Sequence, residues 1–533
     1  MRIPSHAPNI GRCPSSRLTG VLLSAAILLL WAAPVRSETP SREVFPGIAT
    51  ARQIPGEPYD LLGNRIVFTN WYYVHPGDLD WINKEGKSVY VSGNEDPDAA
   101  IFAGKEPPRG IRLMARKPNV VGPMELPHRC IMQDGRLYRG WTDNEYCESA
   151  DGMQWEKKAN LVLDKEADGI HQVFVDPSAP PAERYKSIWV TDSMTPEQFK
   201  DYMQKRPDGW EPRALLHYGD TQKVNCIRGS VSPDGITWKT LPDPLVVEYA
   251  DTLNTGYFDL SLRKYVIYTR YWSVGPYTES QPVNIRNSWT GCGRRAIGRS
   301  ESNDFRQFPP SQLILETPPT MQPSEVLYTN CHTTIPGAPD QHVMFPAVWN
   351  ASVNDTTRIV LASSHDGLNW HWVPGGDLLE TAEHGQWNGG CVWASPNLIE
   401  LPNGDWALPY SAHNIPHKYP RGQRKGGTGY AVWPKGRMVA LEAPDQGQFT
   451  LITIINPGAS LKVNAVSKRT GGIRVEVAGD PERKFEKCDP LFGDRFWTPV
   501  SWQGKTDLGR EKGKPVTLRF KLDQAELYGL QFD

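Results

Sequence analysis

A repeated seven-residue motif constrains the fold of this chain more than any other feature of its sequence. The pattern S-x-D-G-x-x-W occurs in three full copies and one degenerate copy, at residues 149–155, 232–238, 364–370 and 302–308. Asp followed by Gly is typical of a tight hairpin turn, because the Asp side chain bonds backbone amides and Gly adopts a positive φ. The aspartates of successive copies are 83, 70 and 62 residues apart. This repetition predicts one recurring β-unit, and it indicates a structural role for Asp151, Asp234 and Asp366.

Strand-like segments accompany each copy of the motif. Alternating or apolar runs precede three copies at residues 185–190, 264–270 and 358–362. Five further segments lead these units, at residues 125–132, 171–176, 251–259, 326–336 and 387–399. The abundance of Gly, Pro, Trp and Tyr also favours short strands over helices, and residues 195–205 form the one convincing helical segment. Five leading strands predict an all-β chain with a five-bladed β-propeller.

The two ends of the chain differ from this repeating part. Residues 449–533 alternate between apolar and polar side chains with a period of two, which predicts a small C-terminal β-sandwich. Residues 38–113 include an aromatic strand at 66–74, and we expect them to form a strand-rich cap packed on the propeller. The propeller itself is then assigned to residues 114–448.

The first 37 residues have the features of an export signal. Arg2, Arg12 and Arg17 precede an apolar run at 21–33, and Val35 and Ser37 suit a cleavage site before Glu38. An uncleaved membrane anchor is the alternative. We expect a secreted or periplasmic protein with no membrane span after cleavage.

Charge and cysteine content narrow the possible partners. Lys and Arg number 58 and Asp and Glu number 60, so the chain lacks the basic excess of a nucleic-acid-binding protein. Cys130 and Cys147 flank a predicted hairpin and are candidates for a disulfide. No spaced set of Cys and His predicts a metal site, and no cofactor is expected, although a structural Ca²⁺ in the central channel stays open. The oligomeric state is also open.

Several segments resemble a known group of proteins. They are residues 173–186, 251–259, 471–477 and 513–520. Together with the export signal and the repeated turns, they resemble the secreted glycoside hydrolases related to families 32, 43 and 68. The likeness spans roughly residues 110–533 and implies a propeller, a C-terminal sandwich and glycosidase activity on a poly- or oligosaccharide. The W-M-N-D-P-N and R-D-P motifs of invertases are absent, and Val175 stands before Asp176 where R-D-P has Arg.

Glycoside cleavage requires two carboxylates across the scissile bond. The leading strands of a propeller converge on one funnel, so we look for Asp and Glu on these strands. Glu125, Asp251 and Glu325 stand there and are the predicted catalytic residues. The sequence leaves open which is the acid and which the base or nucleophile, and each of the three is alternatively a turn or surface charge.

Other polar and aromatic residues of the leading strands are candidates for substrate binding. They are His128, His171, Asn254, Arg270, His332, Trp387 and Asn388. The three histidines come from separate leading strands and are expected to converge. A loop at residues 416–427, which contains His417 and closely follows His413, is expected to cover the funnel. Two functions remain: a glycoside hydrolase, and a non-catalytic carbohydrate-binding propeller in which the acid–base pair is lost.

Overall fold

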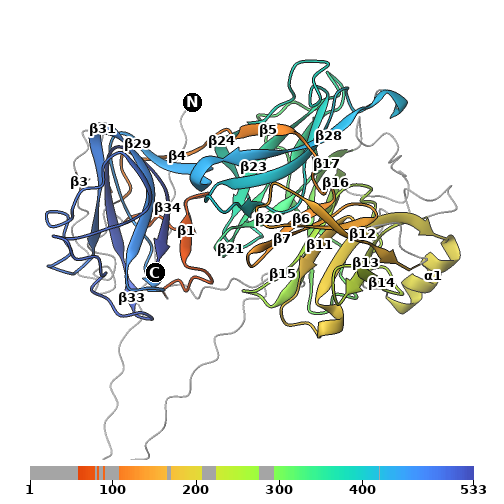
Figure 1. Ribbon diagram of the computed structural model, residues 1–533, viewed down its shortest axis with the longest axis horizontal. Coiled ribbons are helices and arrows are strands. Elements are labelled where there is room, and N and C mark those ends of the chain that lie inside the picture. Colours follow the sequence, from red (N-terminus) through yellow and green to blue (C-terminus); the bar gives the residue numbers. More distant parts are fainter. Residues whose placement is uncertain are drawn as a thin grey trace, which may run out of the picture. The chain divides into compact units, whose positions relative to one another are not determined.

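The computed structural model describes residues 58–77, 81–82, 88–89, 107–164, 170–206, 224–274, 293–418 and 421–533 (Figure 1). Over these residues the chain is built of β-strands with one α-helix, α1 (Pro196–Lys205), and three short 3-10 turns at Pro181–Glu183, Arg421–Gln423 and Pro434–Gly436. This confirms the predicted all-β class. The predicted export signal lies outside the described residues, among which no helix is long and apolar enough to cross a membrane.

Three sheets follow one another in the first half of the repeating region. The first is β6 (Cys130–Asp134), β7 (Leu137–Trp141), β8 (Glu145–Ser149) and β9 (Glu156–Asn160). The second is β11 (Gln172–Val175), β12 (Tyr185–Met194), β13 (Val224–Ser232) and β14 (Thr237–Thr240), with β10 (Val162–Leu163) parallel to β14. The third is β15 (Thr255–Asp259), β16 (Lys264–Val274), β17 (Gly293–Ser302) and β18 (Gln312–Leu315).

Two larger sheets complete the repeating region. The fourth is β19 (Glu325–Thr329), β20 (His332–Ile335), β21 (Ala338–Met344), β22 (Ala347–Asn350), β23 (Thr357–Ser364) and β24 (His371–Leu379). The fifth is β25 (Cys391–Ala394), β26 (Ile399–Glu400), β27 (Trp406–His413), β28 (Gly426–Trp433) and β5 (Asn119–Met124).

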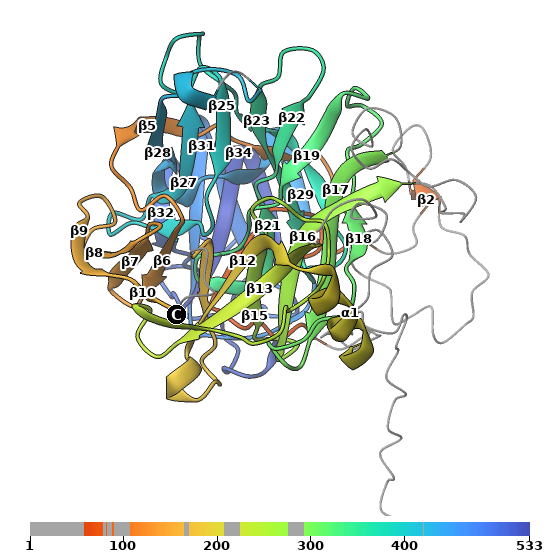
Figure 2. The same ribbon diagram turned by 90° about the vertical axis from the view of Figure 1, so that its right-hand side faces the viewer.

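The five sheets contact one another in a ring. β6 contacts β11, β11 contacts β15, β17 contacts β19, β23 contacts β25, and β26 contacts β6. Figure 2 shows these sheets around a common centre. β5 comes before the first sheet in the chain yet pairs with β28 of the fifth, which closes the ring as in a β-propeller. The blade number of five stays a prediction, which this ring supports.

The repeated motif forms the expected turn. In the second sheet, the amides of Ile236 and Thr237 each donate to Asp234 Oδ1 at 2.8 Å, and the amide of Gly235 donates to Ser232 Oγ at 2.9 Å. Gly235 has a φ of +78°, which a side chain would oppose. The other two full copies repeat these bonds. The motif aspartates are therefore structural, as predicted.

The turns also join neighbouring sheets. Aromatic side chains donate to the carbonyl of a motif glycine in the next sheet: Trp141 to Gly235 at 2.7 Å, Tyr268 to Gly367 at 2.7 Å, and Tyr430 to Gly152 at 2.8 Å. In the degenerate copy Phe305 stands where the glycine would be, and its ring packs edge-on against Phe174 at 5.6 Å. Each copy thus fastens one sheet to the one before it, by a hydrogen bond or by an aromatic contact.

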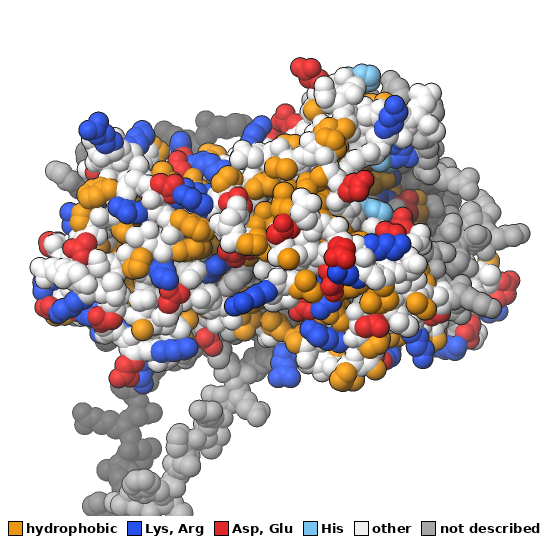
Figure 3. All heavy atoms as spheres, viewed as in Figure 1, with side chains coloured by type: hydrophobic (Ala, Val, Ile, Leu, Met, Phe, Trp, Pro, Cys, Tyr) orange, Lys and Arg blue, Asp and Glu red, His pale blue; other side chains and the backbone are white. Residues whose placement is uncertain are grey.

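The C-terminal residues form the predicted β-sheet structure, with strands from both ends of the chain. The main sheet has the order β32 (Asp494–Pro499), β31 (Leu461–Val477), β34 (Leu518–Phe532), β29 (Val439–Thr450) and β4 (Arg112–Ala115), and β1 (Arg65–Val67) pairs with β34. Two-stranded sheets are formed by β30 (Ile454–Ile455) with β33 (Pro515–Val516) and by β2 (Trp81–Ile82) with β3 (Ser88–Val89). Basic and acidic side chains are interspersed on the face viewed in Figure 3, in keeping with the balanced charge.

The segment expected to cap the propeller contributes strands to this C-terminal sheet and also bonds the fourth sheet of the repeating region, where the Val67 amide donates to Gln341 Oε1 at 2.9 Å and the Ser363 hydroxyl donates to the Thr69 carbonyl at 2.8 Å. Ile66 and Val67 are buried in the same hydrophobic core as Leu530, and Phe68 packs edge-on against Phe449 at 5.6 Å. Burying this apolar run against β34 is the physical reason for its position. Strand β29 of the C-terminal sheet begins at Val439, before the predicted start of the sandwich at residue 449. The domain boundaries at residues 113 and 448 stay a prediction.

Two smaller expectations have clear outcomes. The helix over 195–205 is confirmed as α1, and a capping box fixes its start, because the Gln198 amide donates to Thr195 Oγ1 at 3.2 Å and the Thr195 amide donates to Gln198 Oε1 at 2.9 Å. The candidate disulfide is wrong: Cys130 and Cys147 are both free and buried. Strand β7 lies between their strands, so the two cysteines are not cross-strand neighbours.

Candidate functional site

The five leading strands meet at one pocket of about 240 Å³, which we call the funnel pocket. Each sheet supplies at least one lining residue, in or just before its first strand: His128, His171, Thr252, Tyr328 and Trp393. This convergence places chemically varied side chains from distant parts of the chain within one cavity. The funnel pocket is therefore the candidate active site.

Residues of the predicted covering loop and of the strand before it complete the wall. His413 ends β27, and His417 and Arg424 follow it, and all three line the funnel pocket. Burial and then the cation of Arg424 lower the pKa of His413 to about 4. Burial, Lys418 and Arg424 lower the pKa of His417 to about 4. Both imidazoles are therefore neutral at pH 7 and offer one donor and one acceptor each, which suits sugar hydroxyls.

Tyr328 lies at the centre of this arrangement. Its hydroxyl is 3.1 Å from His417 Nε2. The guanidinium carbons of Arg270 and Arg295 lie 4.9 and 4.8 Å from the centroid of its ring. Burial alone raises the pKa of Tyr328, but the two arginines outweigh it and lower that pKa below its usual value. The hydroxyl is thus more acidic than that of an ordinary tyrosine.

The two arginines form a cationic layer behind Tyr328. Arg270 is 2% exposed and Arg295 is 7% exposed. Burial, followed by repulsion from Arg295, lowers the pKa of Arg270 to about 9. Arg270 is paired with the carboxylate of Asp251, and Arg295 lies against the rings of Trp272 and Trp349 at 5.2 and 5.1 Å.

The three predicted carboxylates do not meet in this pocket. Asp251 is the nearest along the chain, since Thr252 lines the pocket, but its own side chain pairs with Arg270. Glu125 is exposed and lies between β5 and β6, directly after the end of β5. Glu325 pairs with Arg358 and accepts the amide of Gln322 at 2.7 Å, which is a structural arrangement. No described residue that lines the funnel pocket is a carboxylate.

A fourth carboxylate, which the sequence reasoning missed, lies beside the pocket. Asp143 Oδ2 is 3.3 Å from His128 Nε2, and its Oδ1 accepts from Arg129 Nε at 2.5 Å. These two partners lower the pKa of Asp143, outweighing the burial that raises it. Asp143 therefore fixes the His128 ring that lines the pocket.

Two of the predicted substrate-binding residues support the pocket from behind. Asn254 is buried, where it donates to the carbonyls of Ala250 and Thr252 at 3.0 Å and accepts the amide of Arg270 at 3.0 Å. It shapes the turn that carries Thr252. Arg270 has the supporting position described above, so neither side chain lines the pocket itself.

Trp387 and Asn388 lie apart from the funnel pocket. Trp387 stacks on Tyr410 with ring centroids 5.5 Å apart, and Asn388 is only 6% exposed. The Trp387 ring also lies close to the backbone of β28, where a Cβ on Gly429 would be 3.0 Å from the ring. Trp393, six residues further along the same predicted strand, lines the pocket instead.

The prediction that three histidines converge is wrong for His332. His128 and His171 line the funnel pocket, whereas His332 lines a separate pocket of about 160 Å³. His332 Nε2 is 3.1 Å from His342 Nδ1, and His342 Nε2 is 4.0 Å from Asp259 Oδ2. Burial and the neighbouring His342 hold the pKa of His332 well below its usual range. This is a satisfied buried network, so His332 has local partners and does not need a ligand.

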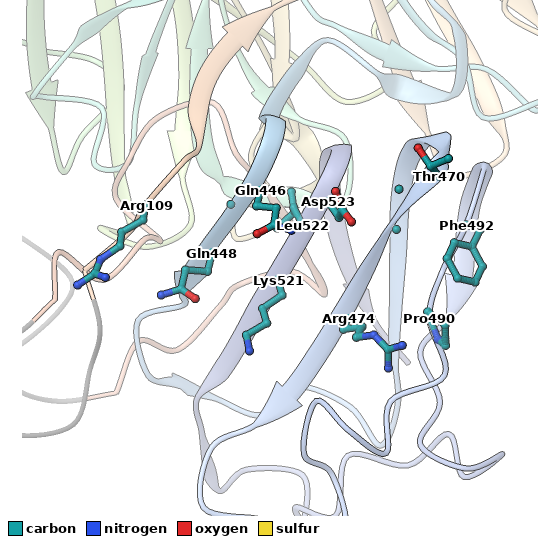
Figure 4. Close-up of a pocket in the computed structure, with 13 residues that line it drawn as sticks. Arg109, Gln446, Gln448, Thr470, Arg474, Pro490, Phe492, Lys521, Leu522 and Asp523 are labelled. Carbon is teal, nitrogen blue, oxygen red and sulfur yellow. The ribbon is translucent and has the colours of Figure 1, made fainter. Parts of the chain in front are cut away.

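A larger pocket of about 600 Å³ lies on the C-terminal sheet (Figure 4). Arg109, Gln448, Arg474, Lys521 and Phe492 are among its lining residues. Glycines at 447, 471 and 472 keep it open, and a Cβ on Gly471 would lie 2.1 Å from the carbonyl oxygen of Asp523. The funnel pocket gathers His413, His417 and Tyr328, whose pKa values are all lowered, so it is the stronger candidate for chemistry.

Neither pocket has the make-up of a metal site. Across the described ranges, no group of three or more His, Cys, Asp and Glu side chains is placed to hold a metal ion.

Comparisons with known proteins add the following. No protein-family model matches the chain, and no curated protein matches it in sequence. Among solved structures, a glycoside hydrolase is similar with 13% identity, a TM-score of 0.36, and coverage of 62% of this chain and 92% of the other. A xylan β-1,4-xylosidase from Bacillus halodurans C-125 has 11% identity, a TM-score of 0.35, and coverage of 78% and 99%.

A third structure belongs to a different class of enzyme. It is an N-acetylgalactosamine deacetylase from F. plautii in complex with blood group B trisaccharide, with 12% identity, a TM-score of 0.37, and coverage of 61% and 95%. A family-43 glycoside hydrolase is also among the similar structures. The family-32/43-like resemblance of the sequence fits these structures, and the function of this chain is argued from its own site.

Proposed function

We propose that this protein is an exported glycoside hydrolase that binds a poly- or oligosaccharide in the funnel pocket. The observation that carries the proposal is the convergence of all five leading strands on one pocket, lined by His128, His171, Thr252, Tyr328 and Trp393. An aromatic ring with hydroxyls and the neutral imidazoles of His413 and His417 is a combination that binds a sugar, because the ring packs on its apolar face and the polar groups bond its hydroxyls. Export rests on the predicted signal at residues 1–37.

Asp251 is the best placed of the three predicted carboxylates for the reaction. Its neighbour Thr252 lines the pocket, and its partner Arg270 lies against Tyr328. The guanidinium of Arg270 favours the ionised carboxylate, which suits a base or nucleophile rather than an acid. Glu125, three residues before His128, is the remaining candidate for the proton donor.

The test measures sugar release from a panel of plant and algal polysaccharides and aryl glycosides. The purified protein is compared with its Asp251→Asn and Glu125→Gln variants, and with Asp445→Asn as a matched control on the exposed part of β29. We expect Asp251→Asn to lower the rate by about a hundredfold or more, with an unchanged melting temperature. Equal rates of sugar release for the wild type, Asp251→Asn and Glu125→Gln would refute the assignment of Asp251 and Glu125 as the catalytic pair.

The second candidate function is carbohydrate binding without cleavage. One observation favours it: none of the described residues that line the funnel pocket is a carboxylate. In the same experiment this function gives saturable binding of one saccharide and no release of product from any.

A further inference from the structure

The charges around the funnel pocket do not balance within the described residues. Four arginines lie in the wall or directly behind Tyr328: Arg129, Arg270, Arg295 and Arg424. Asp143 pairs with Arg129 and Asp251 pairs with Arg270. Arg295 and Arg424 have no carboxylate partner in the parts of the chain that the structure describes. Two positive charges are thus left at this pocket.

The buried cations also have donors to spare. Arg295 Nε and Nη1, and Arg270 Nε and Nη2, have no hydrogen-bond partner among the described residues although both side chains are more than nine-tenths buried. A buried, unpaired N–H of a charged group is costly, so such groups normally meet an acceptor. Burial, followed by repulsion from Arg295, lowers the pKa of Arg270 to about 9, as expected for two buried cations that lie against the same tyrosine ring.

The wall in front of these cations offers polar groups that face the cavity. Tyr328 lines the pocket between the guanidinium groups and the cavity, and its hydroxyl reaches His417. Arg424 also lines the pocket, with Nη1 3.5 Å from His413 Nδ1. An oxyanion at this point would meet a hydroxyl, an imidazole and a guanidinium directly, and two further guanidinium groups behind the tyrosine.

We propose that the funnel pocket is built for an acidic saccharide, whose carboxylate or sulfate is held at Tyr328, His417 and Arg424 in front of Arg270 and Arg295. This inference rests on the proposed function, because it takes the funnel pocket as the saccharide site. It names the substrate class that the function leaves open. The oxyanion supplies the charge that the described wall lacks, and it gives the buried arginines an electrostatic partner.

The test compares acidic saccharides with neutral counterparts of the same length by isothermal titration calorimetry. The probes are oligogalacturonate and its methyl ester, a sulfated galactan oligosaccharide and its desulfated form, and inorganic sulfate alone. We expect at least one acidic form to bind about tenfold more tightly than its neutral counterpart at pH 7. That preference should weaken as the salt concentration rises, because the wall around Arg424 is open to solvent. Whichever acidic form shows the preference identifies the anion as carboxylate or sulfate.

A pair of adjacent residues supplies the matched variants. Arg424→Gln removes a pocket cation, whereas Lys425→Gln removes the next cation along the chain, which is exposed and does not line the pocket. We expect Arg424→Gln to weaken binding of the acidic form about tenfold and of the neutral form less than twofold, and Lys425→Gln to change neither. Arg295→Met provides a second variant behind Tyr328, with the melting temperature as the check that it folds.

The outcomes separate this inference from the function on which it rests. Equal affinity for acidic and neutral forms, or equal effects of Arg424→Gln and Lys425→Gln, would overturn the acidic-saccharide inference and leave the funnel as a saccharide site. Binding of inorganic sulfate as tightly as of the sulfated oligosaccharide would also overturn it, since the pocket would then recognise a free anion. Failure of every saccharide to bind would remove both proposals.

Discussion

Replacing Tyr430 by phenylalanine tests whether the repeated turns hold neighbouring sheets together. The Tyr430 hydroxyl donates to the carbonyl of Gly152 at 2.8 Å, from the fifth sheet to the turn of the first, and both residues are buried. Phenylalanine keeps the ring and its packing, so the change removes this one bond. The Gly152 carbonyl is then left buried without its partner, which costs about 1.5 kcal/mol of unfolding free energy.

The assay is urea unfolding followed by tryptophan fluorescence, from which the midpoint and slope give the unfolding free energy. Tyr528→Phe is the matched control. Its hydroxyl bonds Glu526 within a single strand, and because the Glu526 side chain is 37% exposed, water replaces the bond. We expect the control to lose less than about 0.5 kcal/mol. An unchanged Tyr430→Phe variant, or a control that loses as much, would refute the role given to the turns.

Three further predictions follow from local contacts. Thr195→Ala removes the cap of α1, so the helix should lose about 1 kcal/mol and its amides should exchange faster in hydrogen-exchange measurements; unchanged exchange would contradict this. Arg437 and then Lys435 lower the pKa of Asp494 to about 2, below the value near 4 of an unfolded chain, so its stabilisation is complete above about pH 4 and is lost as the pH falls towards 2. Asp494→Asn should therefore flatten the decline of the urea midpoint over that interval, and an identical decline would argue against the ion pair. Because the pKa of Tyr328 is lowered, Tyr328 should ionise at a lower pH than the other tyrosines. The tyrosinate absorbance of Tyr328 is obtained by subtracting the titration of the Tyr328→Phe variant from that of the wild type. Ionisation of Tyr328 at the same pH as the other tyrosines would contradict this prediction.

Much of the fold follows from local sequence signals. The turn chemistry of S-x-D-G-x-x-W needs only residues within one motif, and its bonds are present around Asp234 as expected. The cap at Thr195 is equally local. The position of residues 65–67 depends instead on pairing with β34 more than 450 residues later, which no local pattern specifies.

The site was predictable to a lesser degree. The predicted leading strands do line one pocket, and His128 and His171 are among the lining residues. Tyr328 and Trp393 lie on the same predicted strands, yet strand alternation alone did not separate them from their neighbours. The importance of Arg295 rests on packing across three sheet strands, where its cation lies against the rings of Trp272, Tyr328 and Trp349.

Hydrogen–deuterium exchange with a bound saccharide tests the central claim, that the funnel pocket is the saccharide site. The wild-type protein is measured with and without the saccharide that it binds most tightly. We predict slower exchange at residues 252–256, 326–330 and 391–395, which carry the pocket lining of three sheets. Protection confined to residues 446–448, 470–474 and 521–523, around the pocket of the C-terminal sheet, would contradict the account.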